Sequence, residues 1–496
     1  MAEASLERLH PLSVLFSVAS AAMRLLLPGL IVILFRPGGQ TDFWLMVLFV
    51  PTVVAGLAKY ASYRYRMNPD ELVIREGIVT RNERHIPYAR IQNIDLVQNP
   101  LQRLLGVAEV RIETASGDKP EAVMRVLSLA AVEQLRRRVF RGAEPVEGRE
   151  VPAAGAAIQA AEAPRVLVRT SLADLVLVGL SSGRGLAVVA AAMGLVWQFD
   201  FMSQIDEHWI KSRLATLDLP LPGPLATVLF VVGAGVGAII LLSALSIVWA
   251  VVRYYGFTLV ARGDDLRIEY GLLTRVTATI PRHRIQILSL ARGPLQRASR
   301  RVAVRVETAG RHEEEGRAAD RLWLAPAIPL ADLPALLRAV LPEVDLDVLE
   351  WRGLAPGATA RIAKKGLIVA AIVTSLAVAS FGRFALVLLP LLVTWVVAHS
   401  RLYVKHAGWA LGEEACAWRS GWWTRRTSLV RYSKIQVLSL AESPFDRRRR
   451  MASLQVDTAG AGHVGHRMDL RYLDAAAAGA AFQHLGRETR LRAFRW

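Results

Sequence analysis

The sequence predicts a polytopic α-helical membrane protein that carries three small β-barrel domains, each closed by a C-terminal helix. Three observations predict this fold. The apolar residues are gathered in long blocks, the polar segments between the blocks repeat one motif, and each copy of that motif contains strand-like alternation. A mean hydropathy of +0.31 beside a charged content of 21% requires such blocks, because evenly mixed residues would not give both values.

The first apolar pair, residues 11–59, is predicted to be transmembrane hairpin 1. Its first block runs from Pro11 to Phe35 and carries Arg24 as its one charge, whereas its second, from Phe43 to Ala58, carries none. Runs of about 20 apolar residues are long enough to cross a bilayer. The small residues at 18–21 resemble a signal-peptidase site, but the apolar stretch continues well beyond them. We therefore expect a retained helix.

Transmembrane hairpin 2 is predicted within residues 165–252. Its first member lies near Leu180 to Phe199, with Arg184 close to its start, and its second runs from Leu225 to Val252 without an internal charge. The second member is rich in glycine, which favours close packing of helices in a membrane. Charges at membrane depth are often functional, so Arg24 and Arg184 are candidates for a transport pathway, although both are near enough to a helix end to reach the interface.

Residues 346–399 are predicted to hold a linker and transmembrane hairpin 3. Its helices, Gly366 to Ser380 and Phe384 to His399, are short for a full span and meet at a tight turn beside Arg383. The alternative for all of these blocks is that they are buried helices of a soluble core. Their length and lack of charge favour the membrane.

Basic residues predict which side of the membrane the polar segments face. The chain has 61 Lys and Arg against 43 Asp and Glu, a formal charge of +18, and most basic residues lie in the long segments between hairpins. By the positive-inside rule these segments face the cytoplasm of an inner membrane. Nucleic acid could also attract such charge, but no platform of aromatic and basic residues for stacking bases is present, so it is not expected as a partner.

The long polar segments are copies of one another. The first copy, from Gly77, has the sequence GIVTRNERHIPYARIQNIDLVQNPLQRLLGVAEVRIETASG, and the copies from Gly271 and Gly421 align to it without a gap. Identity in all three copies is expected by chance at about one position in a hundred, so the repetition is a strong signal of architecture.

Each copy is predicted to be mainly β. Val110, Ile112 and Thr114 alternate with charged residues, which gives the period of two typical of a strand. An amphipathic helical stretch follows in each copy, and one helix on a curled set of strands suggests a small closed barrel. Residues 142–164, rich in Ala, Glu, Pro and Gly, are predicted to be a flexible linker. The three domains are predicted at residues 60–141, 253–345 and 400–490.

The motifs I-P-x-x-R-I-Q, P-L-Q-R and V-x-V-E-T-A-G, in this order, resemble the bacterial pleckstrin-homology (PH) type 2 domain. Two spans followed by such a domain, in three tandem copies, resemble the YdbT-like membrane proteins over nearly the whole chain. The resemblance implies PH-like barrels with a C-terminal helix, cytoplasmic placement on a bacterial cell membrane, and no established enzymatic activity. It also implies a role in envelope stress, since some such proteins are linked to bacteriocin resistance.

The third copy departs from this pattern at several positions. Val430-Arg431 replaces Ile-Pro, and Phe445-Asp446 replaces Leu-Gln. Lys434 replaces the motif arginine and Asp457 the motif glutamate. If the motif binds a ligand, this copy is the least suited to do so.

Charge recurs at two motif positions, one basic and one acidic. The functional interpretation is an ion pair that faces a ligand, and the structural interpretation, which we favour, is a salt bridge between strands that fixes their register. The shared glutamine is expected to form a hydrogen bond to a turn. The motif residues are Arg90, Gln92, Glu113, Arg284, Gln286, Glu307, Lys434, Gln436 and Asp457.

Further arginines follow the proline turn of each copy. They could contact the anionic head groups of phosphatidylglycerol or cardiolipin, where each basic side chain contributes about 1 kcal/mol. The alternative is a solvated surface that also sets membrane topology. The candidates for lipid or partner contact are Arg103, Arg297, Arg300, Arg301, Arg447, Arg448, Arg449 and Arg450.

No motif of catalysis or metal binding is present in the sequence. It has no P-loop, no G-x-S-x-G elbow and no H-E-x-x-H, and its single cysteine, Cys416, excludes an intrachain disulfide. The acidic run at 313–315 is better explained as a solvated hairpin tip than as a metal site. The sequence therefore predicts a non-enzymatic scaffold without a cofactor or metal. Anionic lipids and membrane or cytoplasmic proteins, among them a second PH-domain membrane protein, are the expected partners. The alternative function is a transporter or exporter of lipid or peptide through the six-helix membrane region.

Overall fold

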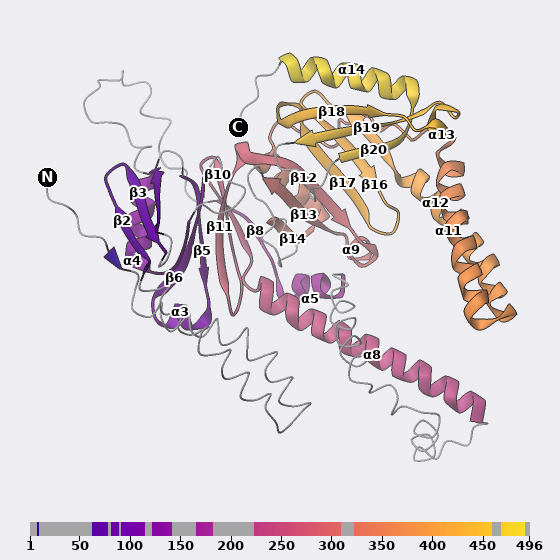
Figure 1. The fold of residues 1–496 in the computed structure, drawn as a ribbon, viewed down its shortest axis with the longest axis horizontal. Coiled ribbons are helices and arrows are strands. Elements are labelled where there is room, and N and C mark those ends of the chain that lie inside the picture. The colour runs from indigo at the N-terminus through magenta and orange to yellow at the C-terminus, as the bar shows by residue number, and fades with distance from the viewer. Residues whose placement is uncertain are drawn as a thin grey trace.

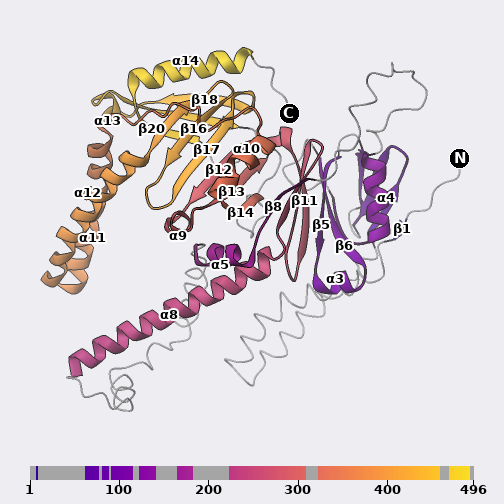
Figure 2. The same cartoon turned by 180° about the vertical axis from the view of Figure 1, so that it is seen from behind.

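The computed structural model describes residues 7–8, 62–77, 81–88, 91–114, 122–140, 165–181, 223–308, 322–458 and 468–491. Predicted hairpin 1, nearly all of the first member of hairpin 2 and the linker at 142–164 lie outside these residues, as do Arg24, Arg184 and Arg90. The repeats follow one another in chain order along the molecule, and the long apolar helices extend from one side of them (Figure 1; Figure 2).

Each repeat contains a first strand set, a second strand set and a closing helix. In the first repeat these are β2 (Arg64–Met67), β3 (Glu71–Glu76) and β4 (Asn82–Pro87), then β5 (Ile91–Gln98), β6 (Val107–Thr114) and β7 (Ala122–Ser128), then α4 (Leu129–Phe140). In the second they are β9 (Thr258–Arg262), β10 (Asp265–Tyr270) and β11 (Arg275–Pro281), then β12 (Ile285–Arg292), β13 (Arg301–Thr308) and β14 (Leu322–Pro329), then α10 (Leu333–Val340). In the third they are β15 (Gly408–Leu411), β16 (Ala415–Ser420) and β17 (Arg425–Arg431), then β18 (Ile435–Ala441), β19 (Met451–Thr458) and β20 (Met468–Asp474), then α14 (Ala475–Leu491).

The second strand set of one repeat forms a sheet with the first strand set of the next. One sheet has the order β7-β6-β5-β11-β10-β9-β8, where β8 is Arg165–Arg169, and another has the order β14-β13-β12-β17-β16-β15. Among the described strands, no pairing closes the two sets of one repeat into a barrel. The predicted barrel closure is therefore not seen, because the strand edge that would close each barrel is used by the neighbouring repeat.

The hydrophobic cores follow this arrangement. The first repeat has a core of its own residues, such as Leu72 and Ile112. The cores of the second and third repeats interlock, since Ala417 and Leu429 of the third repeat pack in the core of the second, and Ile287 of the second packs in the core of the third.

Three described helices are long and apolar enough to cross a membrane, at Gly235–Tyr254, Ala358–Ser380 and Arg383–His406. They belong to α8 (Gly223–Tyr254) and to the antiparallel pair α11 (Ala358–Phe381) and α12 (Leu388–His406), which a short turn joins. The two helices of hairpin 3 are longer than the sequence suggested, because their basic ends are helical as well. The full set of six spans stays a prediction.

Close helix packing occurs at other glycines than those predicted. Gly233, Gly235 and Gly237 of α8 have open space where a Cβ would lie. The tight contacts are instead at Gly179, where a Cβ would lie 2.5 Å from the Ile247 Cα, and at Gly366, where it would lie 2.6 Å from Val396 Cγ1. The glycine-rich stretch therefore does not mark a helix contact among the described residues.

The chain returns to the same sheet after each apolar block. β1 (Glu7–Arg8) pairs with β2, and β8 (Arg165–Arg169) pairs with β9. In the third repeat an isolated bridge joins Arg352, before α11, to Trp409, after α12. Each apolar block thus begins and ends beside the repeat that follows it.

Candidate functional site

In each repeat the candidate arginines lie in or just after a short turn that follows the fourth strand. We call these three turns, residues 99–106, 293–300 and 443–450, the arginine turns. Each holds a short helix that begins with proline, a residue suited to the first helical position: α3 (Pro100–Leu104), α9 (Pro294–Ala298) and α13 (Pro444–Arg447). In the first two, the buried side chains of Gln102 and Gln296 accept hydrogen bonds from the backbone N–H of Asn99 (2.8 Å) and Gly293 (2.9 Å).

Each arginine turn ends in a left-handed residue. The φ angle is +65° at Gly106, +51° at Arg300 and +53° at Arg450. The carbonyl of this residue accepts a backbone hydrogen bond from the segment that leads into the closing helix, as between Ala475 and Arg450 (2.9 Å). Arg300 and Arg450 therefore have a backbone role as well as an exposed charged side chain.

The first two arginine turns hold neighbouring repeats together. The Nη1 of Arg103 donates to the Leu272 carbonyl of the second repeat (3.1 Å), and the Nη1 of Arg297 donates to the Trp422 carbonyl of the third (2.9 Å). These arginines were predicted to contact lipid or a partner, and the structure places them on the next repeat of the same chain. We call the contacts between repeats junction 1–2 and junction 2–3.

The strands at both junctions pair in the same register. Gln98 lies opposite Arg275 at junction 1–2, and the equivalent Arg292 lies opposite Arg425 at junction 2–3. Junction 2–3 is the more extensive, with six residue pairs against three. It also explains one departure of the third copy: Arg431, which replaces a proline, donates to the carbonyls of Arg282 and Ile285 (3.1 Å each).

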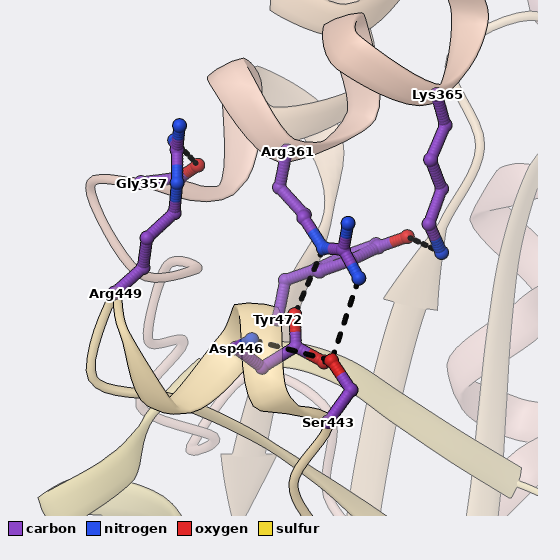
Figure 3. Close-up of polar contacts among 7 residues, drawn as sticks. All are labelled: Gly357, Arg361, Lys365, Ser443, Asp446, Arg449 and Tyr472. Carbon is purple, nitrogen blue, oxygen red and sulfur yellow. Dashed lines mark hydrogen bonds and ion pairs between the residues drawn. The ribbon is translucent and has the colours of Figure 1, made fainter. Parts of the chain in front are cut away.

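The third arginine turn contacts the base of α11, a candidate membrane span, instead of another repeat. The Nε of Arg361 on α11 lies 2.9 Å from Oδ1 of Asp446, and its Nη2 donates to the Ser443 hydroxyl (3.4 Å), as Figure 3 shows. Burial raises the pKa of Asp446, but the Ser443 hydrogen bond and the Arg361 guanidinium outweigh it and hold that pKa below its usual value. In this turn the Ser443 hydroxyl caps α13 by accepting from the Asp446 N–H (3.2 Å), and Asp446, at the glutamine position, anchors α11.

Neighbouring side chains extend this anchor. The phenyl ring of Phe445 lies 5.1 Å from the guanidinium carbon of Arg361 and 5.7 Å from Nζ of Lys364. Lys365 approaches the Tyr472 hydroxyl (3.5 Å), and Arg449 donates to the Gly357 carbonyl (3.4 Å; Figure 3). The Phe445-Asp446 pair that replaces Leu-Gln therefore suits contact with a helix that carries three cations.

The second repeat contacts the helix that precedes it through a similar ion pair, but here the helix carries the acidic residue and the domain carries the arginine. Asp174 of α5 (Leu172–Ser181) is buried and pairs with Arg301, the residue just after the second arginine turn. Ser171 donates to the same carboxylate (2.7 Å). In both described cases an ion pair fixes the helix that precedes the domain to the arginine turn or to the residue after it.

An exposed cluster of cations surrounds the base of α11. Its members carry exposed side chains on α11 and on the third arginine turn, and we call them the α11 basic cluster: Lys364, Lys365, Arg447, Arg448, Arg449 and Arg450. Because the apolar part of α11 begins directly after Lys365, these charges lie at the end of a candidate membrane span.

Exposed apolar loop tips lie at the ends of α8 and α12. Leu272 and Leu273 are 41% and 53% exposed, and the Leu272 N–H donates to the carbonyl of Val252 in α8 (3.0 Å). In the third repeat Trp423 is 60% exposed, and the indole N–H of Trp422 donates to His399 of α12 (2.8 Å). Exposed tryptophan beside an apolar helix end is typical of a membrane interface.

The sequence analysis missed these tips and the anchors Arg361 and Asp174. A signal for the tips was present, because each copy carries two apolar residues between its repeated glycine and threonine. The anchors had no such signal, since acid and base change places between the repeats.

The motif residues lie inside the fold. Arg284 and Lys434 are 8% and 2% exposed, and burial, with a further contribution from Arg431, lowers the pKa of Lys434 to about 8, although Glu343 opposes the shift. Each shared glutamine stands at a bulge in the strand pair, as Gln286 does between Ile285 and Ile287. This placement supports a structural role for the motif, whereas the side chains of Gln92 and Glu113 lie outside the described residues.

The described residues hold no group of His, Cys, Asp and Glu that could bind a metal ion. Cys416 is buried, and burial raises the pKa of its thiol to about 12. The acidic run at 313–315 lies outside the described residues.

Comparison with known proteins gives a consistent picture. The family model for the bacterial PH domain matches residues 14–143, 221–342 and 366–489, and each match begins in or just before a predicted apolar block. The UPF0699 transmembrane protein YdbT of Bacillus subtilis (strain 168) is 24% identical over 476 residues, which cover 92% of this chain and 94% of that protein. The UPF0699 transmembrane protein YdbS of the same organism is 29% identical over 73 residues, which cover 15% and 46%. No solved structure matches.

Proposed function

Because the chain belongs to the bacterial PH domain family, we propose that it is a non-enzymatic scaffold whose three PH domains lie against the anionic cytoplasmic face of a bacterial cell membrane. The chain is a membrane protein with repeated bacterial PH domains, and its relative YdbT is named as a transmembrane protein. The scaffold role, the lipid contact and the cytoplasmic side are the new elements of the proposal.

The pairing around each apolar block supports placement of all three domains on one side. β1 with β2, β8 with β9, and the Arg352 bridge to Trp409 bring the two ends of each block to one sheet. A block that starts and ends at the same sheet crosses the bilayer an even number of times. The excess of basic residues in the segments between blocks then favours the cytoplasmic side.

The α11 basic cluster is the observation that carries the lipid contact. Its exposed cations lie where the apolar part of α11 begins, beside a second helix whose end is lined by Trp395 and Trp422, 5.8 Å apart between ring centres. Each cation near an anionic surface contributes about 1 kcal/mol, so the six together give a strong but weakly selective attraction. Phosphatidylglycerol and cardiolipin head groups have the required charge.

Lipid retention by the full chain tests this proposal. The chain is purified from nanodiscs that contain phosphatidylglycerol and phosphatidylcholine, and bound lipid is counted by native mass spectrometry. We expect Lys364→Gln with Arg448→Gln to lose retained phosphatidylglycerol. The matched control is Arg487→Gln with Arg490→Gln, because these exposed arginines lie on α14, on the side of the molecule away from the apolar helices (Figure 1). Equal retention in both variants would contradict the lipid contact.

Two other sequence predictions concern transport and envelope stress. A transport pathway through the six-helix region depends on Arg24 and Arg184, which lie outside the described residues. A role in envelope stress stays a prediction of the family resemblance. An anionic lipid contact at the cytoplasmic face is compatible with both.

A further inference from the structure

The last sheet ends in a strand whose sequence matches a strand buried in the preceding sheet. β12 has the sequence IQILSLAR, and β18 with the residue after it has IQVLSLAE. β12 lies between β13 and β17, and its first six residues are buried. Among the described residues β18 pairs with β19 alone, and Val437 and Leu440 are 53% and 40% exposed. β18 therefore has the side chains of a central strand in an edge position.

The opposite end of the array differs. β4 is the edge strand of the first sheet and is equivalent to β11 and β17, but it carries Glu83, Arg84 and His85 in its centre. Charged residues on an edge strand prevent pairing with another chain. β18 has no charged residue, and its backbone N–H and C=O groups on the outer edge form a template for a further strand.

Arg447 is the second feature that the third repeat shares with the two internal junctions. It is equivalent to Arg103 and Arg297, each of which donates to a carbonyl in the loop before the first pairing strand of the next repeat. Arg447 is exposed, and its side chain has no hydrogen bond or ion pair among the described residues. Among the described residues, the third repeat thus presents both parts of a junction, a strand edge and an arginine, with no strand set paired to them.

We propose that β18 and Arg447 form a docking site for a further bacterial PH domain, supplied by a different protein. In the register of the two internal junctions, the third strand of the incoming domain pairs antiparallel with β18. A threonine comes just before this strand, and the backbone carbonyl of the residue two positions before that threonine accepts a hydrogen bond from Arg447. This inference deepens the proposed scaffold function and rests on it, because it names the class of partner that the scaffold assembles.

The charge of Glu442 favours an incoming strand that begins with arginine. The shared register places its leading arginine opposite Glu442, where the internal junctions have Gln98 and Arg292. An arginine opposite Glu442 is attracted, whereas Arg292 opposite Arg425 is a pair of like charges. A strand such as β11, with Val-Thr-Ala-Thr-Ile after its arginine, presents no further charge to β18.

A second copy of this chain fits less well. Its edge strand equivalent to β11 and β17 is β4, which in the same register would place Glu83 opposite Leu440 and His85 opposite Leu438. These positions hold Thr427 and Leu429 at junction 2–3. The observations therefore favour a separate protein whose third strand is uncharged.

The probe for this site is a synthetic peptide with the sequence of residues 271–281, GLLTRVTATIP, with cysteine in place of Val276. The full chain in nanodiscs carries Ala441→Cys, the position opposite Val276 in the shared register, and the buried native Cys416 does not compete. We expect a disulfide between peptide and chain. A peptide with cysteine at Thr279, which is out of register, should give only background crosslinking, and so should the charged segment 77–87 with cysteine at Asn82.

Variants of the chain separate this site from the lipid contact. Val437→Lys, at an exposed position, should reduce the crosslink to background while phosphatidylglycerol retention stays at the wild-type level. Arg447→Ala should weaken peptide binding about tenfold, as expected for loss of a hydrogen bond from a charged donor, whereas Arg448→Ala should not. Conversely, the full chain can lack phosphatidylglycerol retention while the crosslink to the peptide still forms, so the two proposals can fail separately.

Two results would overturn the proposal. One is equal crosslinking by the in-register, out-of-register and charged peptides, or none by any of them. The other is dimerisation of the purified chain that Val437→Lys abolishes, because the occupant would then be a second copy of this chain.

Discussion

Junctions 1–2 and 2–3 share one register but differ in depth. Junction 2–3 has six strand pairs and an interlocked core, whereas junction 1–2 has three pairs and separate cores. The sequence of the incoming strand set explains the difference. Ala415, Ala417 and Leu429 of the third repeat are small or apolar and pack on the second repeat. The equivalent residues of the second repeat are polar: Asp265, Arg267 and Thr279.

This comparison teaches that the repeat motif sets the register of a junction, whereas residues outside the motif and departures from it set the strength of the junction. Arg267 pairs with Glu269 (2.7 Å), which keeps that face of the second repeat polar. Junction 2–3 gains the hydrogen bonds of Arg431, and junction 1–2 has Pro281 at the equivalent position. The third repeat departs from the motif partly because it holds its neighbour more firmly.

Truncation of a core residue at the deeper junction should have the largest effect. Leu429 is 1% exposed, so Leu429→Ala should cost about 3 kcal/mol in the free energy that opens the β12–β17 pairing. Thr279→Ala at the equivalent position of junction 1–2 should cost about 0.5 kcal/mol or less. Hydrogen–deuterium exchange of the strand amides measures both. Equal costs would mean that the junctions do not differ in depth.

Loss of the Arg431 guanidinium should have the next largest effect. Arg431→Ala removes two hydrogen bonds to backbone carbonyls and should cost about 2 kcal/mol at junction 2–3. Pro281→Ala is the matched control at junction 1–2 and should have little effect there, because proline supplies no side-chain donor. Exchange of the β17 and β11 amides checks the two variants, and protection of β17 that is unchanged in Arg431→Ala would refute the role assigned to this residue.

The two bridging arginines should differ in the same direction. Arg297 is half-buried and Arg103 is exposed, so Arg297→Ala should cost about 1.5 kcal/mol and Arg103→Ala about 0.5 kcal/mol at their junctions. The rate of limited proteolysis between repeats reports the opening of each junction. A larger effect of Arg103→Ala would show that the exposure of the arginine side chain does not determine how much its contact stabilises the junction.

A smaller effect than that of Arg297→Ala is expected at the end of the array, where Asp446 anchors α11. The pKa of Asp446 is lower in the folded chain than in the unfolded chain. The ionised carboxylate therefore stabilises the folded chain at pH values above the unfolded pKa of roughly 3.9, and this stabilisation is lost as the pH falls through the lower folded pKa. Asp446→Asn should therefore lower thermal stability at pH 7, by an amount typical of an ion pair near the surface, about 1 kcal/mol. At pH 3 and below, the difference between variant and wild type should shrink, and a difference that is the same at every pH would contradict the anchor.

Much of each repeat could be predicted from the sequence, because its signals are local. The alternation around Val110, the closing helices and the apolar length of α8 each depend on a short stretch of chain. The joining of repeats could not be predicted. β5 and β12 stand at the edge of their own repeat's strand set, and their sequence pattern is the same whether they close their own barrel or pair with a neighbour. Only the fold decides between these outcomes.

The sequence analysis named candidate site residues but not the groups that they contact. Arg103, Arg297 and Arg447 were singled out as a repeated set, yet the acceptors of the first two are backbone carbonyls, which leave no trace in a sequence. Arg90 and Glu113 were predicted to be structural, and the buried Arg284 and Lys434 at the equivalent basic position support that interpretation.

Edge-to-edge joining of the repeats is the central claim, and a disulfide test in native membranes examines it most directly. Antiparallel partners have Cα atoms about 4.5–5.5 Å apart, within the range that a disulfide spans. The pairs Val97→Cys with Val276→Cys, and Ala291→Cys with Arg426→Cys, lie in register at the two junctions. We predict that both form disulfides within one chain, whereas Ala291→Cys with Ser428→Cys does so poorly. If both in-register pairs stay reduced, or bond only between chains, the repeats are not joined in this way.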